Sequence, residues 1–415
     1  MHSVELFGGA GGLALGAELA GFKSVAFAEW DRWACDTVRE NALVGHPLVR
    51  DWSVLEGDVR AVDWAAVGQD AVIDVVTGGP PCQPFSMGGK ARAADDARDM
   101  FPAAAEVIRQ LRPQAFVLEN VRGLTRSAFS NYFQLVLLRL KYPDLPPRRA
   151  ESWLDHLQRL QRHETGDGGD ALAEYRVVPT LVNAADYGVP QHRHRVFIIG
   201  FRADVDAEWN FPSPTHTQER LLHDQWISGE YWERHGIATA DRPALDPRLI
   251  KRVAQLENAD VSTLGRPWRT VRDAISGLPE PTRKASAIHL NHRLQLGARQ
   301  YPGHTGSPLD APAKTLKAGD HGVPGGENML VRLDGSVRYF SVREAARLQT
   351  FPDSYELHGA WGEAMRQLGN AVPVRLAEIV MGSVREHLEA AAVRSELALE
   401  RGVNLEGAGS YVQPA

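Results

Sequence analysis

Residues 3–12 read SVELFGGAGG, a short run of strand-forming residues that leads into a turn with four glycines. A strand that ends in such a turn and continues as an apolar helix is typical of a doubly wound α/β fold. Glycine permits the tight turn and lets the backbone approach a cofactor closely. The stretch predicts an α/β fold, although a glycine turn alone also suits an ordinary connection between a strand and a helix.

The same alternation of apolar runs and helical patterns continues through the first half of the chain, which predicts a mostly parallel sheet. The expected strands are residues 4–7, 24–28, 54–57, 73–77, 115–118, 177–182 and 196–200. Helical periodicity returns at residues 342–349 and 374–388. One face of the last helix is marked by Val374, Leu376, Ile379, Val380 and Val384.

Regular alternation is lost in three segments. Residues 143–170 are rich in turn formers around a short amphipathic pattern, so we expect a surface insertion. Residues 201–332 are rich in Pro, Gly, His and Arg, which predicts a second, smaller and irregular lobe. We expect residues 333–390 to rejoin the first domain, residues 1–200, and residues 391–415 to form a C-terminal tail.

Composition narrows the class of protein. The 415 residues are 43% apolar and 24% charged, which is ordinary for two or three globular lobes. No run of about 18 apolar residues and no signal peptide occur, so we expect a soluble, cytoplasmic protein without membrane contact. Two cysteines exclude a disulfide framework and a four-thiolate zinc site, and we expect no metal. The net charge of -6 argues against a cationic coat, but screening leaves room for local basic patches.

Candidate cofactor residues stand at the carboxyl ends of the expected strands, where open α/β sheets bind ligands. Glu29 of AEWD lies about 20 residues after the glycines, a position suited to ribose hydroxyls. Trp30 offers a flat face to an adenine ring, and Asp58 can accept a hydrogen bond from its amino group. Each residue alone also suits a cap or a solvated loop. Together they predict a cofactor with a nucleoside, either a dinucleotide or S-adenosylmethionine.

The fourth strand runs into PPCQPFS, residues 80–86. Prolines fix φ and remove donors, so they stiffen a loop that holds Cys82 at the crevice. Its Gly, Pro and polar neighbours argue against burial in an apolar core, and we interpret Cys82 as a nucleophile. Cys35 lies in an amphipathic helical pattern and is expected to be a core residue.

Charged residues follow at the next two strands. Glu119 of LENVRG, beside a nucleophile, can act as a proton donor, although Asn120 equally suits a helix cap. QHRHRVFIIG, residues 191–200, places Arg193 and Arg195 on one face of a strand because side chains alternate. Two guanidinium groups suit a phosphate or a ring carbonyl, and a solvated strand edge is the alternative.

Seven motifs occur in a fixed order between residues 5 and 373: ELFGGAGG, AEWD, GGPPCQPFS, ENV, NAADYGVPQHRHRVFIIG, RYFSVREAARLQTFPD and QLGNAVP. In sequence and order they resemble the motifs of bacterial cytosine-C5 DNA methyltransferases of the restriction-modification type. The resemblance implies a methyltransferase fold with a target-recognition domain at residues 201–332, whose recurrent pattern is matched by Thr315 and Leu316. Glu5 replaces the usual aspartate, and the 143–170 insertion lengthens the chain.

The resemblance also implies residue roles. The cofactor would be S-adenosyl-L-methionine, with Asn370 folded back beside the glycine turn. The expected cofactor-binding residues are Phe7, Gly8, Gly9, Gly11, Gly12, Glu29, Trp30, Asp58, Pro80 and Asn370. Cys82 would attack C6 of a cytosine flipped out of the duplex, and Glu119 would act at N3. Arg195 would hold the O2 carbonyl, and Arg193 the DNA backbone or the catalytic loop.

The implied partner is double-stranded DNA, bound by a monomer, with a cognate restriction endonuclease that forms no stable complex. Beyond Arg193 and Arg195, the expected basic clusters are Arg283, Lys284, His289, His292 and Arg293, then Arg338, Arg343 and Arg347. Three alternatives stay open. They are an RNA cytosine-C5 methyltransferase, a nicotinamide-dependent dehydrogenase and a non-catalytic DNA-binding relative, although the last would be expected to have lost Cys82 or Glu119.

Overall fold

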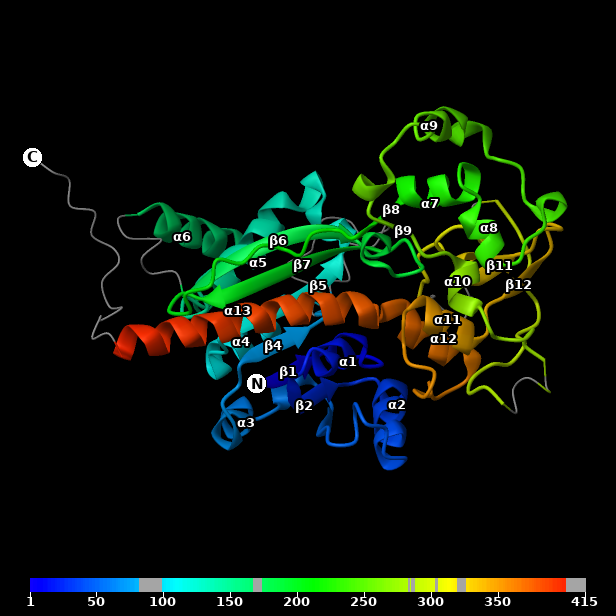
Figure 1. Ribbon diagram of the computed structural model, residues 1–415. Helices are drawn as coiled ribbons and strands as arrows, with labels where there is room; N and C mark the ends of the chain where they lie inside the picture. Colours follow the sequence, from blue (N-terminus) through cyan, green and yellow to red (C-terminus); the bar gives the residue numbers. More distant parts are fainter. Residues whose placement is uncertain are drawn as a thin grey trace, which may run out of the picture.

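The computed structural model describes residues 1–81, 99–166, 174–282, 284, 288–302, 305–318 and 326–400. Its main body is a seven-stranded sheet of order β3-β2-β1-β4-β5-β7-β6 (Figure 1). The strands are β1 His2–Leu6, β2 Lys23–Glu29, β3 Val54–Glu56, β4 Val75–Gly78, β5 Ala115–Val121, β6 Tyr175–Asn183 and β7 His194–Arg202. All seven expected strands are therefore present. Only β7 runs antiparallel to its neighbours, so the sheet is mostly parallel.

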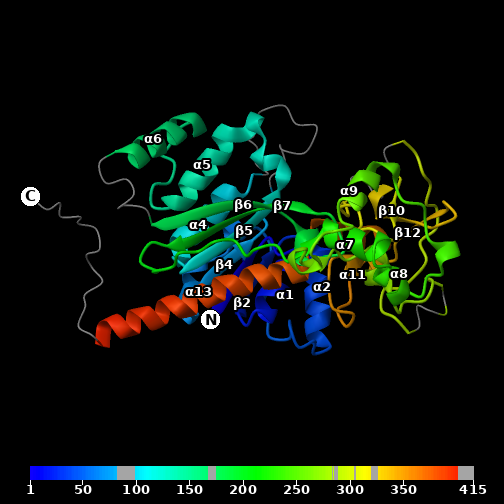
Figure 2. The ribbon, with the colours of Figure 1, turned by 45° about the horizontal axis from the view of Figure 1, so that its top comes forward.

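Helices cover both faces of the sheet because its strands carry two alternating apolar sets. Phe116 and Leu118 of β5 belong to the core on one face, and Ala115 and Val117 to the core on the other. Figure 2 shows these two helical layers. The first layer contains α3 Trp64–Asp70, α4 Phe101–Leu111 and α5 Ser130–Lys141; the second contains α1 Gly12–Leu19 and α13 Val374–Glu400, with α2 Arg32–Leu43 beside α1.

The second lobe lies beyond the carboxyl ends of the strands and has little regular structure (Figure 1). Its elements are β8 His216–Thr217, α7 Gln218–Trp226, α8 Glu230–Arg234, α9 Ile250–Ala254, β9 Arg266–Pro267, α10 Val271–Ile275, β10 Ser307–Pro308 and β11 Met329–Val331. Small apolar clusters replace a single core, one of them built on Leu221, Tyr231 and Trp232. The chain returns to the main body through β12 Val337–Tyr339, α11 Val342–Leu348 and α12 Trp361–Asn370.

The expected surface insertion contains the helix α6 Trp153–Thr165, which packs on α5 through Leu157 and Leu160. Its first turn is capped by Ser152, whose hydroxyl accepts from the Asp155 amide. Cys35 is fully buried, as predicted, and its thiol donates to the Glu29 carbonyl over 3.4 Å. No helix in the part of the chain that the structure describes has the length and apolar character needed to span a membrane.

The predicted tail begins too early. Helix α13 does not stop near residue 390 but continues to Glu400. Ala391 is buried in the core beneath it, and the Arg394 guanidinium contacts Asp206 across 2.9 Å. Alanine, leucine and glutamate dominate residues 389–400, and their high helix propensity prolongs the helix once its first turns are packed.

Candidate active site

The glycine turn after β1 forms an open cradle at the carboxyl edge of the sheet. Phe7 and Gly9 both have φ of 55°, in the left-handed region that favours glycine. A Cβ atom added at Gly9 would meet nothing within 4 Å, so this part of the turn faces open space. The Gly9 amide donates to Glu29 Oε2 over 2.7 Å, which links the turn to the end of β2.

Glu29 organises the end of β2 as well as the turn. Its Oε1 accepts from the backbone amides of Trp30 at 2.8 Å and Asp31 at 2.7 Å. Burial raises the pKa of Glu29, and the three backbone donors act in the opposite direction. Trp30 beside it is 78% exposed, so its ring offers a free apolar face at the rim of the cradle.

Asp58 is already engaged by its own loop. Its carboxylate accepts from the Arg60 amide at 2.9 Å and forms an ion pair with the Arg60 guanidinium at 2.6 Å. These contacts lower the pKa of Asp58, led by the bond to the Arg60 side chain. Asp58 therefore acts as a cap in this structure, one of the two roles, with adenine recognition, that its place in the sequence indicates.

A buried ion pair lies at the end of β5. Arg195 Nε is 2.8 Å from Glu119 Oε1, and both side chains are largely buried. Pairing of β5 with β7 sets Val121 opposite Arg195, which brings Glu119 and the guanidinium together. Burial lowers the pKa of Arg195, whereas the Glu119 charge raises it. A paired carboxylate and guanidinium at a crevice can bind the polar edge of a planar ring.

Asn120 connects this pair to the loop after β4. Its Nδ2 donates to the Pro80 carbonyl over 2.9 Å, and its Oδ1 accepts from the Val121 amide. Pro80 thus lies beside Glu119, and a Cβ atom at Gly79 would be 3.7 Å from Glu119 Oε2. Cys82, the expected nucleophile, lies outside the described residues, two positions after this anchored proline. This contact was not predicted, because the position of Asn120 in the sequence indicates only a helix cap.

Arg193 differs from its expected place. It lies before β7 and is fully buried, so it does not form an exposed pair with Arg195 on a strand face. Its guanidinium donates to the carbonyls of Leu316 at 3.4 Å, Gly369 at 3.0 Å and Asn370 at 3.2 Å. Burial is the main cause that lowers the pKa of Arg193. A DNA phosphate cannot reach a side chain enclosed by backbone in this way.

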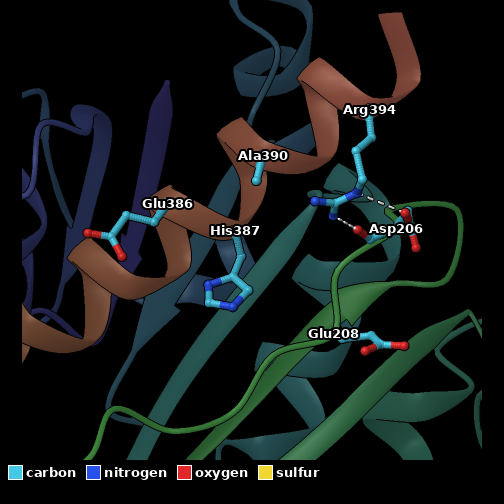
Figure 3. Close-up of a pocket in the computed structure, with 6 residues that line it drawn as sticks. All are labelled: Asp206, Glu208, Glu386, His387, Ala390 and Arg394. Atoms are coloured by element: carbon cyan, nitrogen blue, oxygen red, sulfur yellow. Dashed lines mark hydrogen bonds and ion pairs between the residues drawn. The ribbon is translucent and has the colours of Figure 1, made fainter. Parts of the chain in front are cut away.

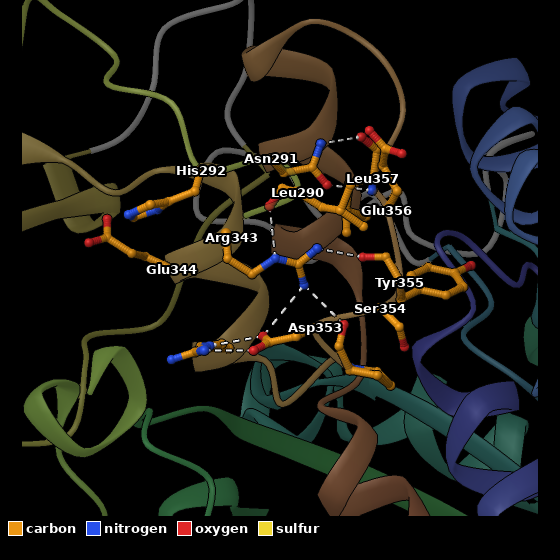
Figure 4. Close-up of polar contacts among 12 residues, drawn as sticks. Leu290, Asn291, His292, Arg343, Glu344, Asp353, Ser354, Tyr355, Glu356 and Leu357 are labelled. Atoms are coloured by element: carbon orange, nitrogen blue, oxygen red, sulfur yellow. Dashed lines mark hydrogen bonds and ion pairs between the residues drawn. The ribbon is translucent and has the colours of Figure 1, made fainter. Parts of the chain in front are cut away.

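Three members of the expected basic clusters are also interior. Arg343 donates to the carbonyls of Leu290, Pro352 and Tyr355, at 3.0, 2.9 and 2.7 Å (Figure 4). Arg338 is buried against Glu344 at 2.7 Å, and His292 bonds the Ser341 hydroxyl at 2.8 Å. The Arg343–Leu290 and His292–Ser341 contacts join the second lobe, residues 201–332, to residues 333–390 of the main body. Arg283 lies outside the described residues, and Lys284, His289 and Arg293 reach the surface, His289 only in part.

The QLGNAVP motif packs beside the glycine turn. Asn370 ends α12 and is exposed, and Val372 follows in direct contact with the turn. A Cβ atom at Gly12 would lie 2.2 Å from the Val372 carbonyl oxygen, so only glycine fits there. The Tyr355 hydroxyl donates to the Ala10 carbonyl at 3.0 Å, a second support that the sequence analysis did not single out.

A surface hollow lies at the opposite edge of the sheet. It is lined by Asp206, Glu208, Glu386, His387, Ala390 and Arg394 (Figure 3). Asp206 follows the end of antiparallel β7, far from the ends of β1, β2 and β5. Arg394 pairs with Asp206, while Glu208 and Glu386 point apart. The hollow therefore takes no part in the site at the carboxyl edge.

Comparison with known proteins agrees with the motifs. The family model described as C-5 cytosine-specific DNA methylase matches residues 1–142 and 170–386, and thus omits α6 and its flanks. The Type II methyltransferase M.PspPI of Psychrobacter is 31% identical, over 94% of this chain and 80% of that protein. M.NgoPII of Neisseria gonorrhoeae is 28% identical, over 94% and 96%.

Solved structures agree in fold. A putative DNA modification methyltransferase from an Escherichia coli prophage superposes with a TM-score of 0.56 at 21% identity, covering 94% of this chain and 99% of that one. The Dnmt2 methyltransferase of Schizosaccharomyces pombe gives 0.53 at 16%, covering 94% and 99%. The family description supports DNA as the substrate over RNA, and it does not support a nicotinamide-dependent dehydrogenase. The chain belongs to the C-5 cytosine-specific DNA methylase family.

Proposed function

We propose that this protein transfers a methyl group from S-adenosyl-L-methionine to C5 of a cytosine within a specific sequence of double-stranded DNA. The observation that most supports the site assignment is the buried Glu119–Arg195 ion pair, held beside Pro80 by Asn120. The first domain would carry the chemistry, and the second lobe, residues 201–332, would recognise the target sequence. A monomer acting as the modification partner of a restriction endonuclease fits this activity.

The residues of the cradle suit S-adenosyl-L-methionine. The space at Gly9 can receive a ligand against the backbone, and the buried Glu29 carboxylate lies where ribose hydroxyls would bind. Trp30 would cover the adenine, and Phe7, Gly8, Gly11, Gly12, Pro80 and Asn370 would line the rest. When bound, the cofactor supplies an electrophilic methyl group.

The chemistry assigned to the chain begins with its nucleophile. C5 of cytosine is a poor nucleophile, and addition of the Cys82 thiolate to C6 would make it electron-rich. Glu119 would hold a proton at N3 and so neutralise the charge that the addition moves into the ring. Arg195 would hold O2 through a guanidinium already oriented by Glu119. After methylation of C5, a base would remove the C5 proton, and the Cys82–C6 bond would break by elimination.

The base must leave the duplex for this reaction, because stacked neighbours block both faces of the ring. Arg193 has no role at the base in this scheme, since it is enclosed by backbone carbonyls. Phosphate contacts would then fall to exposed cations, including Lys284 and Arg293.

Bisulfite sequencing of DNA from cells that express the protein tests the proposal. We expect protected cytosines at one position of one short sequence, and none in cells that express Cys82→Ala. Protection that persists in the Cys82→Ala cells would overturn the assigned nucleophile. An absence of protected cytosines with the folded wild-type protein would overturn the activity itself.

A further inference from the structure

A short segment of the chain touches both the second lobe and the glycine turn. A Cβ atom added at Gly369 would lie 2.2 Å from the backbone nitrogen of Ala318 in the second lobe. Three residues later, the Val372 carbonyl lies against Gly12 of the turn, where an added Cβ would again be 2.2 Å away. Residues 368–372 therefore fill the space between the two parts, with backbone in contact on both sides.

Two buried side chains hold four consecutive carbonyls of this segment. Gln349 Nε2 donates to the carbonyls of Leu368 and Ala371, the second at 3.4 Å. Arg193 Nη2 donates to those between them, of Gly369 at 3.0 Å and Asn370 at 3.2 Å. Helix α12 ends at Asn370, and the last carbonyls of a helix have no partner within it. Side chains from elsewhere in the chain thus fix the position of the segment.

The same network reaches the second lobe at Leu316. Gln191 Oε1 accepts from the Leu316 amide at 2.9 Å, and Arg193 Nη1 donates to the Leu316 carbonyl at 3.4 Å. Gln191 Nε2 in turn donates to Gln349 Oε1 at 3.2 Å. Both backbone groups of one lobe residue are therefore bound by side chains that also bind, directly or through Gln349, the segment beside the turn.

The three side chains of this network are fully buried: Gln191, Arg193 and Gln349. Water cannot replace a hydrogen bond that is lost there, so each partner is held at a fixed distance. Burial of a guanidinium among carbonyls is also expensive. A purely apolar contact would join the two parts at lower cost, which suggests that their fixed relative position matters.

We propose that Gln191, Arg193 and Gln349 form a bridge that couples occupancy of the glycine turn to the position of the second lobe. They are positioning residues, because none of them reaches the crevice. A ligand that orders Gly12 and Val372 also restricts Leu316 and Ala318, and this lowers the entropy that DNA binding must still remove. The role in DNA binding rests on the proposed function, whereas the mechanical coupling does not.

Hydrogen exchange of the wild-type protein, with and without S-adenosylhomocysteine as the probe, tests the coupling without DNA. We expect exchange in the peptide that contains the Leu316 amide to slow by about fivefold or more, because its acceptor belongs to the bridge. Peptides around Trp232, within the lobe's own apolar cluster, should not change. Protection confined to the glycine turn and the end of β2 would overturn the proposal.

A substitution then tests the bridge itself. Gln191→Met removes the amide at nearly constant size, and Gln225→Met is the matched control, since the buried Gln225 side chain donates to the Asp310 carbonyl inside the lobe. The measurement is the Kd for a duplex that carries the target sequence identified by bisulfite sequencing, with and without S-adenosylhomocysteine. We expect the probe to tighten DNA binding by about fivefold or more in wild type and Gln225→Met, and by less than twofold in Gln191→Met.

Equal tightening in all three proteins would overturn the bridge, as would an equal loss in both variants. If Gln191→Met does not fold, the hydrogen-exchange experiment still tests the coupling, because it uses the wild-type chain. Methylation of DNA is measured separately by bisulfite sequencing, so a failed bridge and a failed activity give different results.

Discussion

The carboxyl edge of the sheet and the second lobe both bury polar side chains, but they use them differently. At the edge, strand pairing puts Glu119 beside Arg195, and backbone amides orient Glu29 toward the glycine turn. In the lobe, Asp310 accepts from the Tyr231 hydroxyl at 2.8 Å and pairs with Arg272 at 2.6 Å. The first set lies at the carboxyl ends of the strands, whereas the side chains of the second set bind one another inside the lobe.

The difference follows from the scaffold. Long strands satisfy their own backbone groups, so side chains at strand ends are left for ligands. The lobe has helices of five residues at α8, α9 and α10, and strands of two or three residues. Such short elements are marginal alone, so side chains must bind the loops together. We therefore expect substitutions at the edge to reduce turnover, and substitutions in the lobe to reduce stability.

Replacement of Cys82 is the strongest test at the edge. We expect Cys82→Ala to lower methyl transfer by about 10⁴-fold or more, since the other cysteine of the chain, Cys35, is fully buried. The affinity for S-adenosyl-L-methionine, measured by calorimetry, should stay within about threefold, because the thiol would act on the DNA side of the crevice. An equal loss of cofactor affinity would mean that the cysteine supports the cofactor site instead.

Cys82 can also be trapped as a covalent adduct on DNA. Duplex DNA with 5-fluorocytosine at the target position should form an adduct that survives denaturing electrophoresis, because fluorine cannot leave C5 as a cation. The adduct should need the cofactor for stability and map to the Cys82 peptide by mass spectrometry. Methylation of ordinary DNA without an adduct on the fluorinated duplex would exclude covalent catalysis.

Replacement of Glu119 should have the second largest effect on turnover. We expect Glu119→Gln to lower turnover by about 10²- to 10³-fold, because an amide cannot deliver a proton to N3. It also removes the charge that orients Arg195 at 2.8 Å. Single-turnover methylation at saturating DNA measures the effect, and Glu106→Gln, in an exposed pair on α4, is the control. Near wild-type rates in Glu119→Gln would assign proton transfer to another group.

Asp310 tests the opposite side of the comparison. We expect Asp310→Asn to cost about 3 kcal/mol of lobe stability, since it leaves the Arg272 guanidinium without its counter-ion. Turnover at saturating DNA and cofactor affinity should change by less than about threefold. Urea unfolding and methylation assays check this, with Asp246→Asn in an exposed pair of the same lobe as the control. A fall in turnover as large as that of Glu119→Gln would remove the distinction between the two regions.

The sheet was predictable from the sequence because hydrophobic periodicity reports each strand locally. All seven expected strands exist, and their ends differ from the predicted ones by at most two residues, except that β5 ends at Val121, three residues beyond its predicted end. The direction and place of β7 between β5 and β6 were not predictable, because they depend on pairing between distant segments. The candidates Glu29 and Glu119 followed from the rule that parallel strands bring their carboxyl ends to one edge.

Arg193 shows why the other contacts of the site could not be predicted from the sequence. Alternation tells which strand face a side chain shares, but not which distant segment covers that face. Here the cover comes from Leu316 and from Gly369 and Asn370, more than a hundred positions along the chain. Arg343 was misjudged for the same reason, since its carbonyl partners come from three separate loop residues.

Glu5 offers the most discriminating test, because it is a buried carboxyl at the sheet that the chemistry does not use. Burial raises its pKa to about 8, and a hydrogen bond from Thr77 opposes that rise only in part. In the unfolded chain the carboxyl ionises near its usual value of 4.5. Between these two values the folded protein binds more protons than the unfolded one, so its stability falls as the pH rises from about 4.5 to about 8.

Glu5→Gln removes this dependence because an amide does not ionise. We expect its free energy of unfolding to increase, relative to that of wild type, by a few kcal/mol between pH 5 and pH 8, because wild type loses stability over this range. Urea unfolding at several pH values measures the difference, and Glu40→Gln on the exposed face of α2 should give a flat line. Turnover should stay within about threefold, since the Glu5 side chain is buried in the sheet and bonded to Thr77. A flat difference for Glu5→Gln would mean that the carboxyl is ionised in the fold, and that buried charge at this edge is tolerated without a ligand.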